Sequence, residues 1–264
     1  MFRSTGIITA MTANALILFA IAVLGWLAGA LVNYLADILP VKRRLAKPIC
    51  AACHDPMPGI NYWLWPRRCP ECWSRRSWRT WVVEIFFIVA AVWLWLNPPS
   101  KFGFWSGLLL LAFFGVVFVI DMEHRLILHM VSIFGAGLGL ILGIYMHGPW
   151  MTFLGGAAGF GIMFGLYWLG DFFARWLARR RGETLTEEAL GFGDVNLAGV
   201  LGLLLGWPGI VAGLLLTILI GGAISILYLL LMVILRRYHN FMAIPYGPFL
   251  VISAVLLLYF QWPH

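Results

Sequence analysis

Long apolar stretches recur along this whole chain, and they restrict its fold more than any other feature. A helix that spans a bilayer needs roughly 17–25 mostly apolar residues, and eight stretches reach or approach that length. They lie at Ala13–Leu39, Trp81–Leu96, Phe104–Ile120, Met130–Met146, Met151–Leu177, Val195–Trp207, Gly209–Leu235 and Ile244–Phe260. The chain is 62% hydrophobic and 11% charged, against about half and about a quarter in soluble chains. We therefore expect an all-α polytopic membrane protein with about eight transmembrane helices.

Basic residues cluster in the loops that eight spans would place on one side of the membrane. Arg3 and Lys101 alone fall on the other side. The clustered residues are Lys42, Arg43, Arg44, Lys47, Arg67, Arg68, Arg75, Arg76, Arg79, Arg125, Arg175, Arg179, Arg180, Arg181, Arg236 and Arg237. Because loops rich in Lys and Arg stay cytoplasmic, we expect the 40–80 loop inside and both termini outside. The net charge of +7 then reflects membrane orientation, and the lipid bilayer rather than nucleic acid is the expected partner.

The first apolar stretch is expected to be retained as a span. It runs from about Ile7 to Leu39, too long for the apolar region of a signal peptide, and it lacks a clear A-x-A cleavage site. Glycine pairs interrupt two later stretches, at 155–156 and 221–222. In membrane helices, such small residues allow close packing of neighbouring backbones, which is the role we expect for them.

All four cysteines lie in the 40–80 loop, as Cys50-x-x-Cys53 and Cys69-x-x-Cys72. This spacing is typical of zinc sites, and a cytoplasmic location keeps thiols reduced. Two disulfides or four free thiols are the alternatives. A closed four-cysteine site has no open position for water, so we expect structural rather than catalytic Zn²⁺. The expected domains are a first transmembrane helix at 1–39, a small zinc-binding domain at 40–80 and a membrane domain at 81–264.

Acidic residues within or beside spans are costly and therefore suggest function. Asp37 near the end of the first span is interpreted as solvated, and Asp171 as an ion pair with Arg175 at i+4. Glu84 has no local partner, and it is expected to pair across helices or to line the site. The same acids would also suit a proton or cation path, so an ion- or proton-coupled transporter is a rival hypothesis.

Asp121 and Asp194 are the strongest catalytic candidates. Asp121 follows an apolar run at the cytoplasmic end of the third span, and Asp194 begins the sixth span within Gly191-Phe-Gly193-Asp194. Opposite helix directions place both acids at one membrane depth. One ionised carboxylate can take a proton from water while a protonated one donates to a scissile carbonyl. Gly191 and Gly193 are expected to let backbone approach the substrate and to permit unusual dihedral angles.

These motifs resemble those of one membrane enzyme family. Gly191-Phe-Gly-Asp194 resembles the G-x-G-D motif of intramembrane aspartyl proteases, and its surroundings resemble the prepilin peptidase pattern G-x-G-D-V-K-L. Ile120-Asp121 through Ile127 resembles the segment of that family that bears the first catalytic aspartate. Further similar stretches are Gly29–Asn33, the paired CxxC loop, Val83-Glu84 and Ile244-Pro-Tyr-Gly-Pro-Phe249.

The resemblance implies an aspartic endopeptidase of the bacterial cytoplasmic membrane. Such enzymes cleave the basic leader from type IV prepilins or from type II secretion pseudopilins, typically after Gly and before Phe. Many also N-methylate the new terminus with S-adenosylmethionine, which would be a second cofactor beside zinc. Glu123 and Glu84 are predicted to support the substrate site, with Glu187 and Glu188 as further acids that could attract a basic leader, or that could form a solvated loop.

Several positions depart from the family pattern, among them Ser77-Trp-Arg-Thr80 before the second span, where the family usually has S-x-R-Y-P. Leu128 and His129 stand where the family usually has Pro followed by Asp or Asn, and Asn196 replaces a Lys. None of them removes a catalytic acid, so they bear on substrate preference and on methylation. An inactive scaffold of pilus assembly is the third hypothesis. The sequence names neither the pilin nor the oligomeric state.

Overall fold

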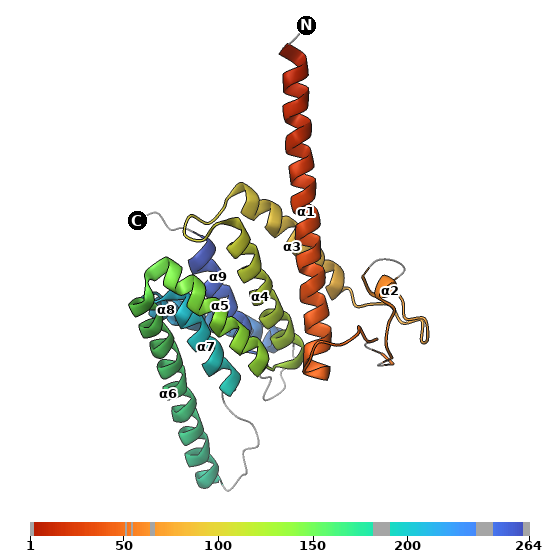
Figure 1. Cartoon of the computed structure of the whole chain (residues 1–264). Coiled ribbons are helices and arrows are strands. Elements are labelled where there is room, and N and C mark those ends of the chain that lie inside the picture. Colours follow the sequence, from red (N-terminus) through yellow and green to blue (C-terminus); the bar gives the residue numbers. More distant parts are fainter. Residues whose placement is uncertain are drawn as a thin grey trace. The chain divides into compact units, whose positions relative to one another are not determined.

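Helices make up nearly all of the regular structure in the computed structural model of this chain (Figure 1). The structure describes residues 3–50, 52–53, 55–63, 67–181, 191–235 and 245–260. Within these ranges the helices are α1 (Arg3–Lys42), α2 (Gly59–Trp63), α3 (Arg79–Leu96), α4 (Gly103–His124), α5 (His129–His147), α6 (Pro149–Arg181), α7 (Phe192–Leu205), α8 (Gly209–Ile234) and α9 (Gly247–Tyr259). The same ranges contain no named strand, only two isolated β-bridges.

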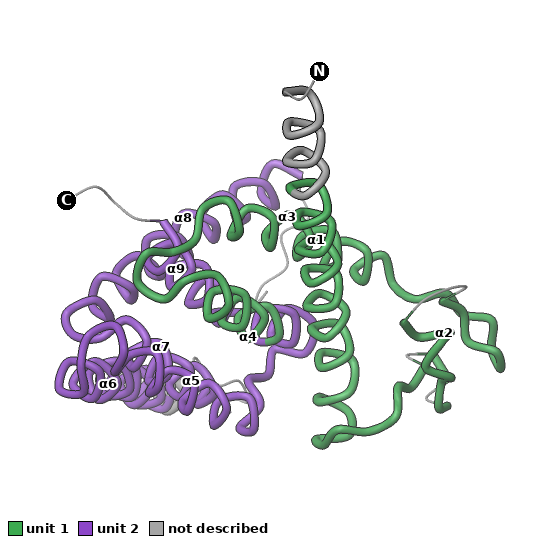
Figure 2. Tube along the Cα trace, turned by 45° about the horizontal axis from the view of Figure 1, so that its top comes forward, with its two compact units in different colours: residues 1–116 green, residues 117–264 purple. Residues whose placement is uncertain are grey.

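Six of these helices are long and apolar enough to cross a membrane: α1, α3, α4, α5, α6 and α8. The two others at predicted spans, α7 and α9, are apolar but have only 14 and 13 residues. Each apolar stretch of the sequence thus coincides with a helix. The chain divides into two compact units, residues 1–116 and 117–264, which are coloured separately in Figure 2.

In the first unit, α1 and α3 pack closely through two glycines of α1. A Cβ atom added at Gly25 would lie 2.5 Å from the Phe87 carbonyl oxygen, and one at Gly29 would lie 2.9 Å from the Glu84 Cα. The neighbouring Asn33 side chain donates a 3.1 Å hydrogen bond to the Thr80 carbonyl oxygen. The Gly29–Asn33 stretch therefore sets how α1 meets the start of α3.

In the second unit, glycines bring the backbones of α6 and α7 together. A Cβ atom added at Gly155 would overlap the Gly202 carbonyl oxygen, and one at Gly156 would lie 2.6 Å from the Leu203 side chain. This confirms the packing role predicted for that pair. At the other pair, an added Cβ at Gly221 would meet the Phe249 ring at 3.2 Å, whereas Gly222 has nothing within 4 Å. The packing prediction is therefore wrong for Gly222.

Glycine also ends α7. Gly206 has a φ of 65°, in the left-handed region, and its amide donates a 2.9 Å hydrogen bond to the Gly202 carbonyl oxygen. Such a residue ends a helix at no steric cost when it lacks a Cβ. The helix that carries Asp194 is therefore short because its last turn is closed by this glycine.

Candidate active site and metal centre

Asp121 lies in the last turn of α4, and its residue is only 4% exposed. The helix ends one turn later at His124, because Arg125 adopts a φ of 50° and donates its amide to the Asp121 carbonyl oxygen at 2.9 Å. Arg125 thus closes the helix as a left-handed cap in place of the usual glycine. The burial of the Asp121 carboxyl group inside an apolar helical unit is what an unusual functional acid would show.

Asp194 lies in the first turn of α7, and its amide donates a 3.0 Å hydrogen bond to the Gly191 carbonyl oxygen. The expectation of unusual dihedral angles here is wrong. Gly191 has an ordinary φ of −76°, and Gly193 is not among the described glycines with positive φ. Gly193 is needed for packing instead, because an added Cβ would lie 2.8 Å from the Ile127 Cβ. This contact holds the first turn of α7 against the segment that follows Asp121.

A third motif reaches the same acid from the start of α9. A Cβ atom added at Gly247 would lie 2.5 Å from the Asp121 Oδ2, a buried oxygen that accepts no hydrogen bond from the residues that the structure describes. Sequence reasoning noted this motif without giving it a role. Glycine is required here because only a residue without a side chain allows the backbone so close to the acid.

The two acids share an electrostatic environment. The Asp121 charge acts on Asp194, and the Asp194 charge acts on the neighbouring Tyr246 phenol. Tyr246 is a residue that sequence reasoning missed, although its position beside Gly247 in the last motif was a usable signal. The end of α4 and the starts of α7 and α9 therefore meet in one place within the second unit.

The other predicted site residues lie elsewhere or at the surface. Glu123 is exposed in the last turn of α4, and Glu84 belongs to the first unit, so their role as substrate-site support stays a prediction. Glu187 and Glu188 lie outside the described residues. Leu128 precedes α5 and His129 begins it, exposed. The predicted ion pair between Asp171 and Arg175 is confirmed at 2.8 Å.

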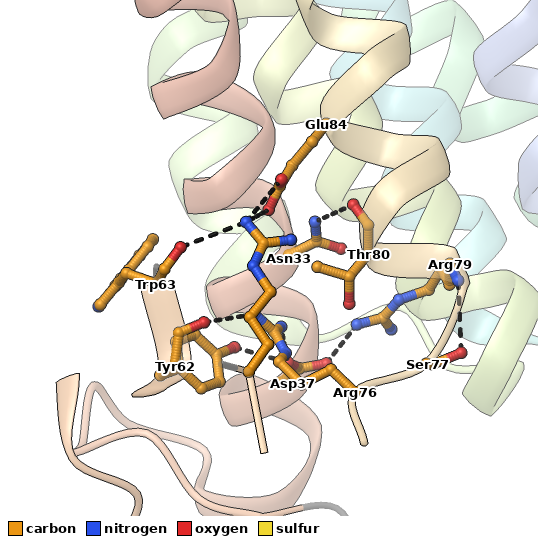
Figure 3. Close-up of polar contacts among 10 residues, drawn as sticks. Asn33, Asp37, Tyr62, Trp63, Arg76, Ser77, Arg79, Thr80 and Glu84 are labelled. Carbon is orange, nitrogen blue, oxygen red and sulfur yellow. Dashed lines mark hydrogen bonds and ion pairs between the residues drawn. The ribbon is translucent and has the colours of Figure 1, made fainter. Parts of the chain in front are cut away.

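Glu84 is the centre of a buried charge cluster in the first unit (Figure 3). The Arg67 guanidinium donates to both Glu84 carboxylate oxygens, at 3.1 and 2.8 Å, and the Trp26 indole donates to Oε2 at 3.1 Å. Arg67 also lies over the Trp81 ring, 4.3 Å from its centroid. Because Arg67 belongs to the 40–80 loop, this pair ties the loop to the flank of α3.

Asp37 anchors the same loop to α1, so its interpretation as a merely solvated residue is wrong. It accepts hydrogen bonds from Tyr62 at 2.5 Å and from Arg76 at 2.7 Å, and it also pairs with Arg79. Burial and the adjacent Asp37 charge raise the pKa of the Tyr62 phenol, so Tyr62 stays a donor. Figure 3 shows these side chains turned toward one another where α1 and α3 meet the loop.

The four cysteines converge, as their spacing predicts. Their Sγ atoms all lie within 4.8 Å of one another, with 3.6 Å between Cys50 and Cys72 and between Cys53 and Cys69. Disulfide sulfurs would be about 2.05 Å apart, so these four thiols are free. Sulfurs bound tetrahedrally at about 2.3 Å to a Zn²⁺ ion would be separated by roughly 3.8 Å, and the observed cluster is close to that size.

Two similar hairpins present these thiols. Each has one antiparallel bridge, Ile49 with Pro56 and Arg68 with Arg75, and the first cysteine of each donates its amide across the turn, to Asp55 or to Ser74. The Ala52 amide also points at the Cys50 Sγ, at 3.4 Å. Amides directed at sulfur favour thiolates, which is the state that binds a metal ion. This cluster could therefore hold a metal ion.

The class of protein is now defined: a helical, multi-spanning chain with two interacting acids in one unit and a cluster of four cysteines in the other. A family model described as the type IV leader peptidase family matches residues 108–226, which include both aspartates. No solved structure matches the chain.

Curated relatives agree with this match, and each of those compared below is named "Prepilin leader peptidase/N-methyltransferase". The Aeromonas hydrophila relative is 28% identical over 233 residues, which is 84% of this chain and 74% of the relative. The Aeromonas salmonicida (strain A449) relative is 28% identical over 79% of this chain and 69% of its own length. The Pectobacterium carotovorum subsp. carotovorum relative is 25% identical over 89% and 90%. Residues 108–226 thus match the family that the motifs predicted, and the curated relatives carry the corresponding name.

Proposed function

We propose that this chain is an aspartic endopeptidase that removes the leader peptide of type IV prepilins or pseudopilins at the cytoplasmic face of the bacterial inner membrane. One observation carries the proposal: three motifs of the second unit meet at Asp121. Gly247 touches its carboxyl group, Gly193 packs on the segment after it, and Asp194 interacts with it electrostatically. The family match and the names of the curated relatives support the same activity.

In the proposed reaction, one carboxylate removes a proton from a water molecule while the other, protonated, donates to the oxygen of the scissile carbonyl. The water oxygen bonds to the carbonyl carbon, and the resulting tetrahedral intermediate collapses with cleavage of the C–N bond. The leaving nitrogen then takes up the proton that the base had received. As the C=O bond re-forms, one hydroxyl of the intermediate returns a proton to the aspartate that had acted as the acid. Neither aspartate is consumed, and the pair ends with one shared proton, as it began.

The helix positions of the two acids suggest which of them acts as the base. Asp194 lies in a first helical turn, where the helix dipole favours a negative charge, and Asp121 lies in a last turn, where the dipole disfavours it. We therefore assign the ionised role to Asp194 and the shared proton to Asp121.

Co-expression with a prepilin tests the peptidase assignment. Wild type should shorten the prepilin on a gel, whereas Asp121→Asn and Asp194→Asn should both leave it at full length. Asp171→Asn serves as a matched control. It also removes one aspartate charge, but Asp171 pairs with Arg175 on its own helix and is distant in sequence from both acids. Cleavage that survives either site substitution would refute the dyad, and no cleavage by wild type would favour a scaffold or a transporter.

N-methylation of the new terminus with S-adenosylmethionine is a second proposed activity. The names of the relatives support it, and no site for it is identified among the residues that the structure describes. Mass spectrometry of the processed pilin gives the test, since the mature chain should gain the mass of one methyl group. A mature chain without that mass would limit the enzyme to peptide cleavage.

For the four-cysteine cluster we propose structural Zn²⁺, held by Cys50, Cys53, Cys69 and Cys72. The separation of the sulfurs and the all-thiol composition of this cluster both suit a closed tetrahedral site. The metal would supply folding energy to the 40–80 domain and take no part in peptide cleavage. The divisions 1–39, 40–80 and 81–264 are proposed on the same basis.

The proposed topology has eight crossings, with both termini outside and the 40–80 domain in the cytoplasm. It rests on the distribution of basic residues and on the eight apolar helices, two of them short. Reporter fusions at residue 60 and at residue 185 should both score as cytoplasmic. An external score at either position would overturn the arrangement.

A further inference from the structure

The second cysteine hairpin, residues 67–76, holds a tryptophan in an unfavourable backbone conformation. Trp73 has a φ of 57°, and its amide donates a 3.0 Å hydrogen bond to the Cys69 carbonyl oxygen. A positive φ is uncommon outside glycine and is an outlier for a bulky side chain. Glycine would close this turn without strain. A bulky residue kept at such a position suggests that its indole side chain has a function.

The Trp73 side chain is not packed in the interior of the loop. The residue is 71% exposed, although four aromatic or sulfur side chains in or beside the same loop are buried or packed together: Tyr34, Tyr62, Trp63 and Met57. A tryptophan with an apolar body and one N–H donor is suited to the boundary between lipid and water. The hairpin therefore presents an unpacked interfacial side chain at a strained position.

Two arginines face each other across the same hairpin. Arg68 and Arg75 form its antiparallel bridge, so like charges stand directly opposite, which is destabilising unless an anion balances them. Within the part of the chain that the structure describes, no ion pair is formed by either guanidinium, nor by Glu71, the acid of this hairpin. The neighbouring Arg67 and Arg76, by contrast, form ion pairs, with Glu84 and Asp37 respectively.

The ion pairs of Arg67 and Arg76 place the hairpin near the membrane boundary. Arg67 and Arg76 bracket the hairpin, and they bind Glu84 on α3 and Asp37 on α1, near the ends where both helices meet the loop. Four residues of extended chain reach about 13 Å from such anchors. The headgroup layer on each side of a bilayer is roughly 5–8 Å thick, so the hairpin tip lies within its reach.

We propose that the hairpin 67–76 docks the four-cysteine domain onto the anionic leaflet, with Trp73 inserted at the interface and Arg68 and Arg75 bound to lipid phosphates. Charge complementarity selects this occupant. The cytoplasmic leaflet carries anionic headgroups, whereas the basic leader of a prepilin would be repelled by the two arginines. The site does not involve the acids of the second unit, and it rests on the proposed topology, in which α1 and α3 are spans and the 40–80 domain is cytoplasmic.

Hydrogen exchange of the full-length protein in lipid nanodiscs tests this docking. Exchange of peptides that cover 67–76 should slow when phosphatidylglycerol is added to phosphatidylcholine, by roughly fivefold for each arginine engaged. Arg68→Gln/Arg75→Gln should abolish the lipid difference. Lys47→Gln, an exposed basic residue of the same loop, should leave most of it in place. Inorganic phosphate added to phosphatidylcholine discs should give no protection.

Trp73→Gly separates docking from folding, because it should weaken the protection of the hairpin by lipid without weakening metal retention. Glycine relieves the positive φ, so bound metal should resist a chelator at least as well as in wild type, while protection of the hairpin by lipid falls. Metal loss in Trp73→Gly would show that the indole stabilises the hairpin and would contradict the insertion. Equal exchange of wild type in both lipids, or full protection by inorganic phosphate alone, would overturn the proposal.

Discussion

At the scale of single residues, the contact between Gly247 and Asp121 is the most sensitive point of the candidate site. A Cβ atom at Gly247 would lie 2.5 Å from the Asp121 Oδ2, closer than two such atoms can approach. Gly247→Ala must therefore displace the carboxyl group or the start of α9. Displacement of a reacting group by about 1 Å can cost roughly 100-fold in rate. We expect prepilin cleavage to fall by about that factor, measured by the rate of the gel shift.

Gly222→Ala is the matched control for this variant, because an added Cβ at Gly222 meets nothing within 4 Å. It should cleave at the wild-type rate. Equal activity of Gly247→Ala and Gly222→Ala would mean that Asp121 does not need its observed position.

The buried pair of Arg67 and Glu84 gives a second residue-scale prediction. Removal of one partner from a buried pair leaves an uncompensated charge and costs about 3–5 kcal/mol. Arg67→Met should therefore lower the free energy of unfolding by about that amount, measured by thermal or denaturant melting in detergent. Arg175→Met breaks the exposed pair with Asp171 and should cost at most about 1 kcal/mol. In Arg67→Met/Glu84→Leu, much of the lost stability should return; no recovery would show that packing, not charge, dominates.

Sequence reasoning succeeded at the residue scale where partners are local. The Asp171 pair was predicted because Arg175 lies four residues away on the same helix. Asp37 was misjudged because its partners Tyr62, Arg76 and Arg79 lie 25, 39 and 42 residues away and meet it only through the tertiary fold. The Asp121 and Asp194 candidates came from motifs, whereas the contact of Gly247 with Asp121 depends on where α9 begins.

At the scale of elements, the packing of α6 on α7 decides where Asp194 lies. Gly202 faces Gly155 so closely that an added Cβ would overlap the Gly155 carbonyl oxygen. Gly202→Val should force the two helices apart, with lower thermal stability and loss of prepilin cleavage. Gly165→Val on α6 is the control, since an added Cβ there meets nothing within 4 Å. Similar melting of both variants would show that α7 is not held by this contact.

Apolar length predicted the helices well because each span must satisfy its backbone hydrogen bonds internally. The boundaries were less predictable. The α4 helix continues past Ile120 to His124, so Asp121 lies inside the helix, where the left-handed Arg125 ends it. The short α2 and the two cysteine hairpins have no hydrophobic periodicity from which they could be predicted. Their conformation follows instead from the clustering of four thiols and from the contacts of Tyr62 and Arg67.

At the scale of the whole molecule, we expect the proposed 40–80 domain to depend on a metal ion and on its anchors, because its apolar cluster is small. Among the residues that the structure describes, the buried members of this cluster are Cys50, Met57, Tyr62 and Cys69. So few buried side chains cannot offset the entropy lost on ordering such a loop. We expect one Zn²⁺ per chain by elemental analysis. Chelation, or Cys69→Ser, should open the 40–80 segment to protease while leaving residues 117–264 resistant, since these form a separate compact unit.

The same reasoning predicts how metal binding depends on pH. Thiolates bind Zn²⁺ and thiols do not, so protons compete with the metal and acid should release it. Protection of the 40–80 segment should therefore be lost as pH falls, in parallel with zinc release, and added Zn²⁺ should shift the transition to lower pH. In Cys69→Ser, the segment should be sensitive to protease at every pH tested. A wild-type segment that stays protected after complete zinc loss would show that the Glu84 and Asp37 anchors suffice without the metal.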